Sequence, residues 1–142
     1  MKYNSLVELF LQLVQIDAVS LHERPVADFI KQLFRTWRID VYEDQAGQQL
    51  GGDCGNLIVR LPAHRHAGPA LLLLAHMDTV HSTAGVQVRE TDGVLRSDGG
   101  TILGVYNRAG VALILQLLQE ILENDLAHPP LEIVFTVAEE LG

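Results

Sequence analysis

Two short clusters in this chain of 142 residues contain the side-chain types that metal-assisted hydrolysis needs. The first is His76-Met77-Asp78, in the segment LLLLAHMDTV, and the second is Glu139-Glu140, in the segment LEIVFTVAEELG. An imidazole is a good nitrogen ligand for a transition metal, and a nearby carboxylate can orient that imidazole and raise its basicity. Because His76 and Asp78 are two residues apart, they point to the same side of an extended chain.

The adjacent acids Glu139 and Glu140 can take two different roles. They would diverge if the strand continued, but at a strand end one can reach a metal while the other faces a water molecule. A metal-assisted hydrolase needs both a carboxylate ligand and a general base. Either cluster alone is more often a solvated strand end. Because both clusters follow apolar strands, a metal site and a pair of solvated strand ends are about equally good interpretations.

The apolar pattern predicts the elements that position these residues. Helical spacing predicts three helices, over residues 5–14 (with Asn4 or Ser5 as the N-cap), 23–37 and 107–124. Strand patterns cover residues 39–44, 56–62, 71–76 and 131–137, and a hairpin covers residues 86–98 with its turn at Asp92-Gly93. Residues 47–55 are glycine-rich turn material. The unalternating run LLLLA predicts a strand that is buried on both faces.

This order of elements indicates one α/β domain with a mostly parallel sheet. In such sheets sites form at the carboxyl ends of strands, where both polar clusters stand. His64 and His66 could bind a metal as an H-x-H pair, but we interpret them as solvated loop residues. Cys54, in GGDCGN, could be a nucleophile, and the plainer interpretation is a small structural residue.

Composition excludes several classes of function. Hydrophobic residues make up 48% and charged residues 20% of the chain, and the net charge is −8. With no basic run, nucleic acid is not an expected partner. No apolar run approaches the length of a membrane span, and the N-terminus does not resemble a signal peptide. A single cysteine fits a reducing compartment, so we expect a cytoplasmic protein and no membrane partner.

Four separated segments then become recognisable as a set. LLLLAHMDTV, RSDGGTILG, AGVA and LEIVFTVAEELG occur in this order. Together they resemble the zinc-dependent exopeptidase family of peptidase T, glutamate carboxypeptidase, aminoacylase and succinyl-diaminopimelate desuccinylase. The peptidase T-like (tripeptidase-like) branch is the most similar, since LVQIDAVS, ERPVADFI and GNLIVRLPA also resemble its N-terminal segments.

The resemblance implies a three-layer α/β sandwich with a mostly parallel mixed sheet, of the phosphorylase/hydrolase-like type. It also implies a metallopeptidase with two zinc ions that a carboxylate bridges. Such a hydrolase cleaves a peptide or related amide bond next to a free terminus, by means of metal-activated water. His76 would bind one metal and Glu140 the other, Asp78 would orient His76, and Glu139 would be the general base.

The chain departs from the family where the bridging carboxylate is expected. The family stretch usually reads L-G-A-D-D-K-A-G, whereas Gly104 to Gly110 reads G-V-Y-N-R-A-G. Tyr106 therefore falls on the bridging aspartate and Asn107 on the acid that follows it. A neutral phenol, with a pKa near 10, cannot replace the charge of a carboxylate. We expect Tyr106 to fill the space of an absent metal, and a zinc-bound tyrosinate is the alternative.

The resemblance also covers only part of a family member. It predicts that residues 1–142 are a single truncated domain, the N-terminal part of a catalytic core. The lid or dimerisation domain and the C-terminal half, with its remaining ligands, would be absent. Such a truncation could leave an apolar sheet edge uncovered, so we expect a homo-oligomer.

Three hypotheses follow from the sequence. The first is an exopeptidase segment that acts on peptide substrates only with its missing half and is inactive as an isolated chain. The second is a non-catalytic relative, a pseudoenzyme that serves as a binding or assembly module. The third is a mononuclear metal-binding domain that uses His76 with Glu140 or with a loop histidine.

Overall fold

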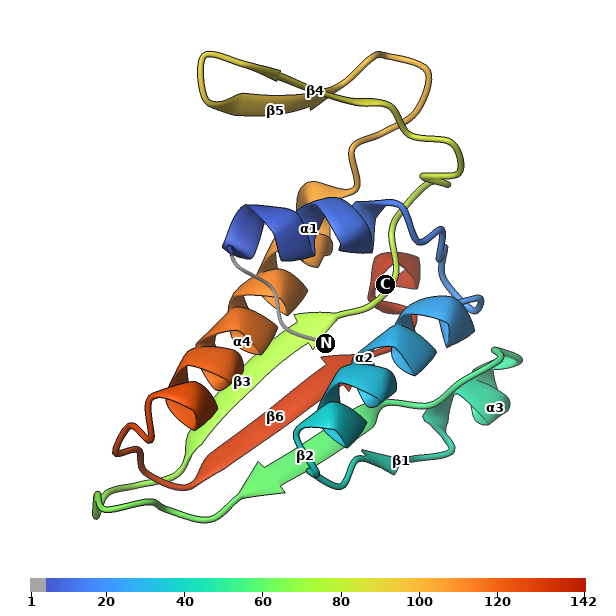
Figure 1. Ribbon diagram of the computed structural model, residues 1–142. Helices are drawn as coiled ribbons and strands as arrows, with labels where there is room; N and C mark the ends of the chain where they lie inside the picture. The colour runs from blue at the N-terminus through green and yellow to red at the C-terminus, as the bar shows by residue number, and fades with distance from the viewer. Residues whose placement is uncertain (1–4) are drawn as a thin grey trace.

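A computed structural model describes residues 5–142 of the chain (Figure 1). One mixed sheet of four strands forms its base, in the order β1-β2-β6-β3. The strands are β1 (Tyr42–Glu43), β2 (Leu57–Leu61), β6 (Leu131–Thr136) and β3 (Leu71–His76). The α-helices of the described part are α1 (Leu6–Val14), α2 (Arg24–Thr36), α3 (Ala46–Leu50) and α4 (Val105–Glu123).

The sheet is mixed as expected, but the prediction that it is mostly parallel was wrong. Among its pairings, β1–β2 and β2–β6 are antiparallel, and β3–β6 is parallel. A parallel neighbour requires a crossover of a dozen or more residues. The loop of residues 62–70 joins β2 to β3, which lie on either side of β6, and it is too short for such a crossover, so these two strands run in opposite directions. The segment from β3 to β6 contains α4 and has the required length.

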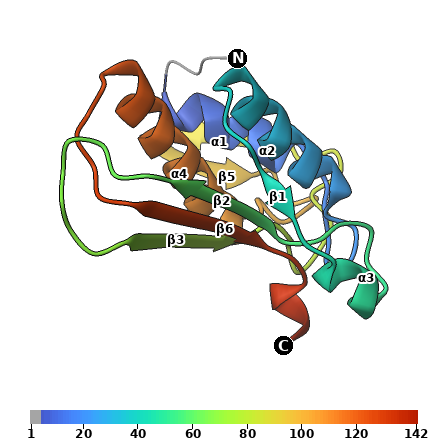
Figure 2. The same ribbon diagram turned by 90° about the horizontal axis from the view of Figure 1, so that it is seen from below.

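The helices cover one face of the sheet. Figure 2 shows α1, α2 and α4 on the same side of the strands. In the described part of the chain the arrangement therefore has two layers, and the predicted three-layer sandwich is not formed by these residues. Leu72 and Leu74 on the other face are 56% and 59% exposed, so β3 is not buried on both faces as its apolar run predicted.

The core lies between the helices and the covered face of the sheet. Phe34 of α2 packs edge-on against Phe135 of β6, with ring centroids 6.4 Å apart. Burying such side chains contributes roughly 1.5–3 kcal/mol each. The other fully buried apolar side chains include Leu9, Leu13, Ile30, Leu57, Leu115, Leu118 and Ile133. This core fixes the two neighbouring strands whose ends carry the polar clusters.

The structure also tests the predicted N-cap, hairpin and glycine-rich turn. Ser5 caps α1 by accepting a hydrogen bond from the Glu8 N–H at 3.2 Å, whereas Asn4 lies outside the described residues. The hairpin β4 (Val88–Thr91) and β5 (Val94–Ser97) is confirmed, with left-handed backbone at Asp92 and Gly93. Helix α3 forms where a turn was predicted. No described helix combines the length and apolarity that crossing a membrane requires.

Candidate metal centre at the ends of β3 and β6

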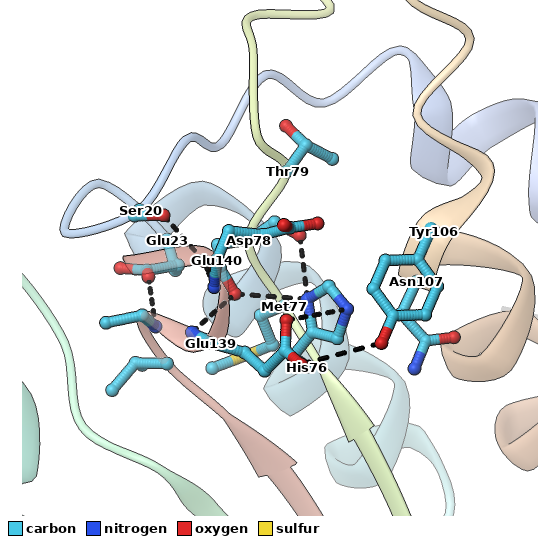
Figure 3. A network of polar contacts seen from close by, with 12 residues as sticks. Ser20, Glu23, His76, Met77, Asp78, Thr79, Tyr106, Asn107, Glu139 and Glu140 are labelled. Carbon is cyan, nitrogen blue, oxygen red and sulfur yellow. Dashed lines mark hydrogen bonds and ion pairs between the residues drawn. The ribbon is translucent and has the colours of Figure 1, made fainter. Parts of the chain in front are cut away.

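The parallel pairing of β3 with β6 brings the two polar clusters together. His76, the last residue of β3, lies opposite Thr136, the last residue of β6. The chain then turns at Ala138 into a short 3-10 helix, η1 (Glu139–Leu141). As a result, His76, Glu139 and Glu140 each offer one potential ligand atom within 4.8 Å of the others (Figure 3).

Two contacts to Asp78 fix the orientation of the His76 ring. Its Nδ1 lies 3.1 Å from Asp78 Oδ1 and 3.0 Å from the Asp78 carbonyl oxygen. Both partners are acceptors, so Nδ1 carries the proton of the neutral ring, and in that form Nε2 keeps its lone pair. Nε2 is buried, makes no hydrogen bond and lies 3.6 Å from Glu139 Oε2. A buried, unpartnered acceptor beside two carboxylates fits a divalent cation.

The charges around the ring act in opposite directions on its protonation. Burial alone would lower the pKa of His76, but the Asp78 carboxylate and then the Glu139 carboxylate raise it above its ordinary value overall. A site of this negative charge attracts a positive ion, either a proton or a metal.

Asp78 is fully buried and connects both halves of the cluster. Its carboxylate accepts hydrogen bonds from Ser20 Oγ at 2.6 Å, the Glu139 N–H at 3.2 Å and the Glu140 N–H at 3.0 Å. Burial would raise the pKa of Asp78, but these bonds and the one from His76 lower it well below its usual range. Asp78 therefore stays ionised and positions the two glutamates as well as the histidine.

Glu23 is a second buried carboxylate behind the cluster, and its role was not predicted from the sequence. Its Oε1 accepts hydrogen bonds from the Ala138 N–H at 2.8 Å and the Leu21 N–H at 3.0 Å. Ala138 has a φ of 57°, a left-handed conformation that non-glycine residues adopt rarely. Glu23 thus stabilises the turn that presents Glu139 and Glu140. Its partner is 115 residues away, so no local pattern could reveal the contact.

Arg108 was likewise not predicted from the sequence. Its guanidinium is fully buried and donates to the carbonyl oxygens of Met77 and Ile16. Burial lowers the pKa of Arg108 to about 10, although the charge of Asp78 acts against this. Arg108 is thus a buried cation that balances the acids behind the cluster.

Tyr106 lies on the solvent side of the cluster. Its ring packs edge-on against His76 with centroids 4.6 Å apart, and its hydroxyl lies 3.5 Å from Glu139 Oε1. The Glu139 charge raises the pKa of Tyr106, so the phenol stays neutral. The side chain is 62% exposed, so it stands beside the cluster without being packed into it. The backbone at Tyr106 and Asn107 is not helical, and regular α4 geometry begins at Arg108.

The loop histidines do not join the cluster. The backbone of His64 pairs with that of His128 near the first residues of β3 and β6, at the other end of the strands. The His64 Nε2 lies 2.8 Å from Asp125 Oδ1. The structure therefore gives no support to a site that combines His76 with a loop histidine.

Comparison with known proteins finds similar chains among the peptidases. No family model matches the chain. A tripeptidase from Staphylococcus aureus is 36% identical with a TM-score of 0.89, and the aminopeptidase PepT from Bacillus cereus is 34% identical with a TM-score of 0.90. In both cases the match covers 96% of this chain and 37% of the other. The protein YqjE of Bacillus subtilis is 35% identical, again over 96% of this chain and 37% of its own.

A more distant structure shares the fold. It is the YXEP protein of Bacillus subtilis, described as a dinuclear metal-binding peptidase of the M20 family, with a TM-score of 0.59 and 18% identity. The chain spans little more than a third of the length of the tripeptidase, PepT and YqjE. On these likenesses the chain is related to the peptidase T and tripeptidase metallo-exopeptidases and matches about a third of their length.

Proposed function

We propose that this chain is the N-terminal part of a peptidase T-like catalytic core and supplies His76, Glu139 and Glu140 to a zinc centre for peptide hydrolysis. The observation that carries the proposal is the grouping of these three side chains within 4.8 Å around a buried His76 Nε2 that has no hydrogen-bond partner. The chain alone is proposed to bind one cation there and to be inactive. A catalytic zinc usually has about three protein ligands and a water. If Glu139 serves as the general base, this cluster provides only two ligands, His76 and Glu140.

Each residue has a role that its contacts support. Zinc, when bound, would supply Lewis-acid polarisation of water and of the scissile carbonyl. His76 and Glu140 are the proposed ligands. Asp78 keeps the proton of His76 on Nδ1, so that Nε2 stays available. Glu139 is the proposed general base, because its carboxylate lies 3.6 Å from Nε2 and remains partly open to solvent.

The second candidate function is that of a non-catalytic relative. Tyr106 favours it, because a neutral phenol contacts His76 where the family resemblance implies a bridging carboxylate. In that case the chain would keep the fold and serve as a binding or assembly module. The two candidates differ in the number of cations that the cluster holds and in the effect of restoring the acid.

Metal content and hydrolysis test the proposal together. We expect zinc-equilibrated wild-type protein to contain one more zinc per chain than His76→Ala, as measured by elemental analysis and native mass spectrometry. The isolated chain should not cleave tripeptides. Tyr106→Asp should bind one zinc more than wild type, because it would restore the bridging carboxylate that the family resemblance implies. Tyr106→Phe is the matched control and should add none.

Three results would decide against parts of this assignment. Equal zinc content in wild type and His76→Ala would remove the His76 site. Tripeptide cleavage by the wild-type chain alone would overturn the expected inactivity. If Tyr106→Asp binds the additional zinc but remains inactive when a relative's C-terminal part is supplied, the result supports the second candidate function, a non-catalytic relative.

A further inference from the structure

A second group of potential metal ligands lies where the start of α2 meets the loop between α3 and β2. Glu23, Asp53 and Cys54 each offer one ligand atom within 4.8 Å of the others. This group shares no residue with the cluster of His76, Glu139 and Glu140. Glu23 connects the two, because its Oε1 also accepts a hydrogen bond from the Ala138 N–H.

Burial distinguishes this group from an ordinary acidic surface. Glu23 and Cys54 are buried, whereas the Asp53 side chain is 37% exposed and gives the group an opening to solvent. Both N–H donors that reach the Glu23 carboxylate bind Oε1. Its Oε2 is buried and has no hydrogen-bond partner among the described residues. An unpaired carboxylate oxygen inside a protein is unfavourable, and a bound ion is one of the few features that compensate for it.

Contacts that involve no metal hold the group in place. The Asp53 N–H donates to the Leu21 carbonyl at 3.1 Å, and the Arg24 N–H donates to Asp53 Oδ1 at 2.9 Å. The Arg24 guanidinium would oppose a cation, but its charge is paired with Glu43, with Nη2 2.6 Å from Oε1. The ligand positions are therefore fixed before any ion binds, which favours a defined site.

The thiol determines which ions suit this group. Burial, aided by the negative charge of Glu23, raises the pKa of Cys54 to about 12, so without a cation the thiol stays protonated. A bound metal reverses this preference, because a coordinating thiol loses its proton. Thiolate sulfur favours zinc and similar ions, whereas Ca²⁺ and Mg²⁺ prefer oxygen ligands alone.

We propose that Glu23, Asp53 and Cys54 form a second, structural site for a thiophilic divalent cation of the zinc class. Binding transfers the Cys54 thiol proton to solvent and leaves one coordination position for water. The ion compensates the unpaired Glu23 Oε2 and fixes the carboxylate whose Oε1 holds the Ala138 turn. It therefore stabilises the segment that presents Glu139 and Glu140.

Cobalt binding separates this site from the His76 centre. We expect Co²⁺ titration of the whole chain to produce a near-ultraviolet thiolate-to-cobalt charge-transfer band that saturates at one ion per chain. The band should persist in His76→Ala, since the His76 cluster contains no sulfur. It should disappear in Cys54→Ser, which keeps the size of the side chain. Glu23→Gln and Asp53→Asn should each weaken binding by about tenfold or more, as a lower bound from the loss of outer-shell partners.

The outcomes keep the two assignments apart. Wild-type protein that is folded by circular dichroism but gives no charge-transfer band, while cobalt fills the His76 site, would overturn this proposal and leave the first intact. Retention of the band in Cys54→Ser would overturn it as well. A band that persists in His76→Ala, in a chain that shows no His76-dependent metal, would support this site while removing the other.

Discussion

The two sides of the candidate metal centre are built differently. On the side of β3 and β6, Asp78 is fully buried and its carboxylate binds Ser20, His76 and two backbone N–H groups. On the side of α4, Tyr106 is largely exposed, with one edge-on ring contact and one long hydroxyl contact. Asp78 therefore contributes to the stability of the fold, whereas a substitution at Tyr106 should change few other contacts.

Removing Asp78 is the strongest way to break the first side. We expect Asp78→Ala to lower the free energy of unfolding by about 3–5 kcal/mol, because it leaves the donors that bind this carboxylate without an acceptor and removes a negative charge that favours the buried Arg108 cation. Urea denaturation followed by circular dichroism measures this loss. Asp78→Asn, which keeps an acceptor oxygen, is the matched control and should cost less. A loss below about 1 kcal/mol for Asp78→Ala would contradict a core role.

Lowering the pH tests the contribution of Asp78 to stability without a substitution. The pKa of Asp78 is lower in the folded chain than in the unfolded one, so its ionisation stabilises the fold. This contribution is complete above the unfolded value of about 3.9 and is lost as the pH falls toward the folded value. We expect wild type to lose on the order of 2 kcal/mol more than Asp78→Asn between about pH 6 and pH 2. If the free energies of unfolding of wild type and Asp78→Asn fall by the same amount over this pH range, the acid sensitivity has a different source.

Changing Tyr106 should have the smallest effect on stability. Because its side chain is 62% exposed, Tyr106→Ala should shift the free energy of unfolding by no more than about 0.5 kcal/mol. The same urea experiment measures it beside Asp78→Ala. A loss comparable to that of Asp78→Ala would mean that both sides of the centre belong to one cooperative unit.

Local patterns predicted most of the elements. Helix α2 and the hairpin at Asp92-Gly93 formed where periodicity and turn chemistry placed them. The direction of β2 was not predictable from its own residues, because one of its two partners is β6, a strand far along the chain. The apolar run of β3 suggested burial on both faces, since hydrophobicity alone does not show whether a second layer covers the other face of the sheet.

The candidate site was predicted only in part. His76, Asp78, Glu139 and Glu140 were predicted from strand ends and from a family resemblance, and the structure brings them together. Ser20, Glu23 and Arg108 were missed, because each acts through partners that are distant in the sequence. A buried hydrogen-bond network of this kind leaves no periodic signal in the residues that form it.

The uncovered face of the sheet has a consequence for how the chain behaves at different ionic strengths. Leu72 and Leu74 are exposed there, beside an ion pair in which Arg60 Nε lies 3.0 Å from Glu132 Oε1. At low salt, a net charge of −8 makes copies of the chain repel one another. At about 0.1 M salt this repulsion is screened beyond about 10 Å, while contact between leucines is not. The salt concentration therefore sets whether charge or apolar surface governs the colloidal behaviour of this protein.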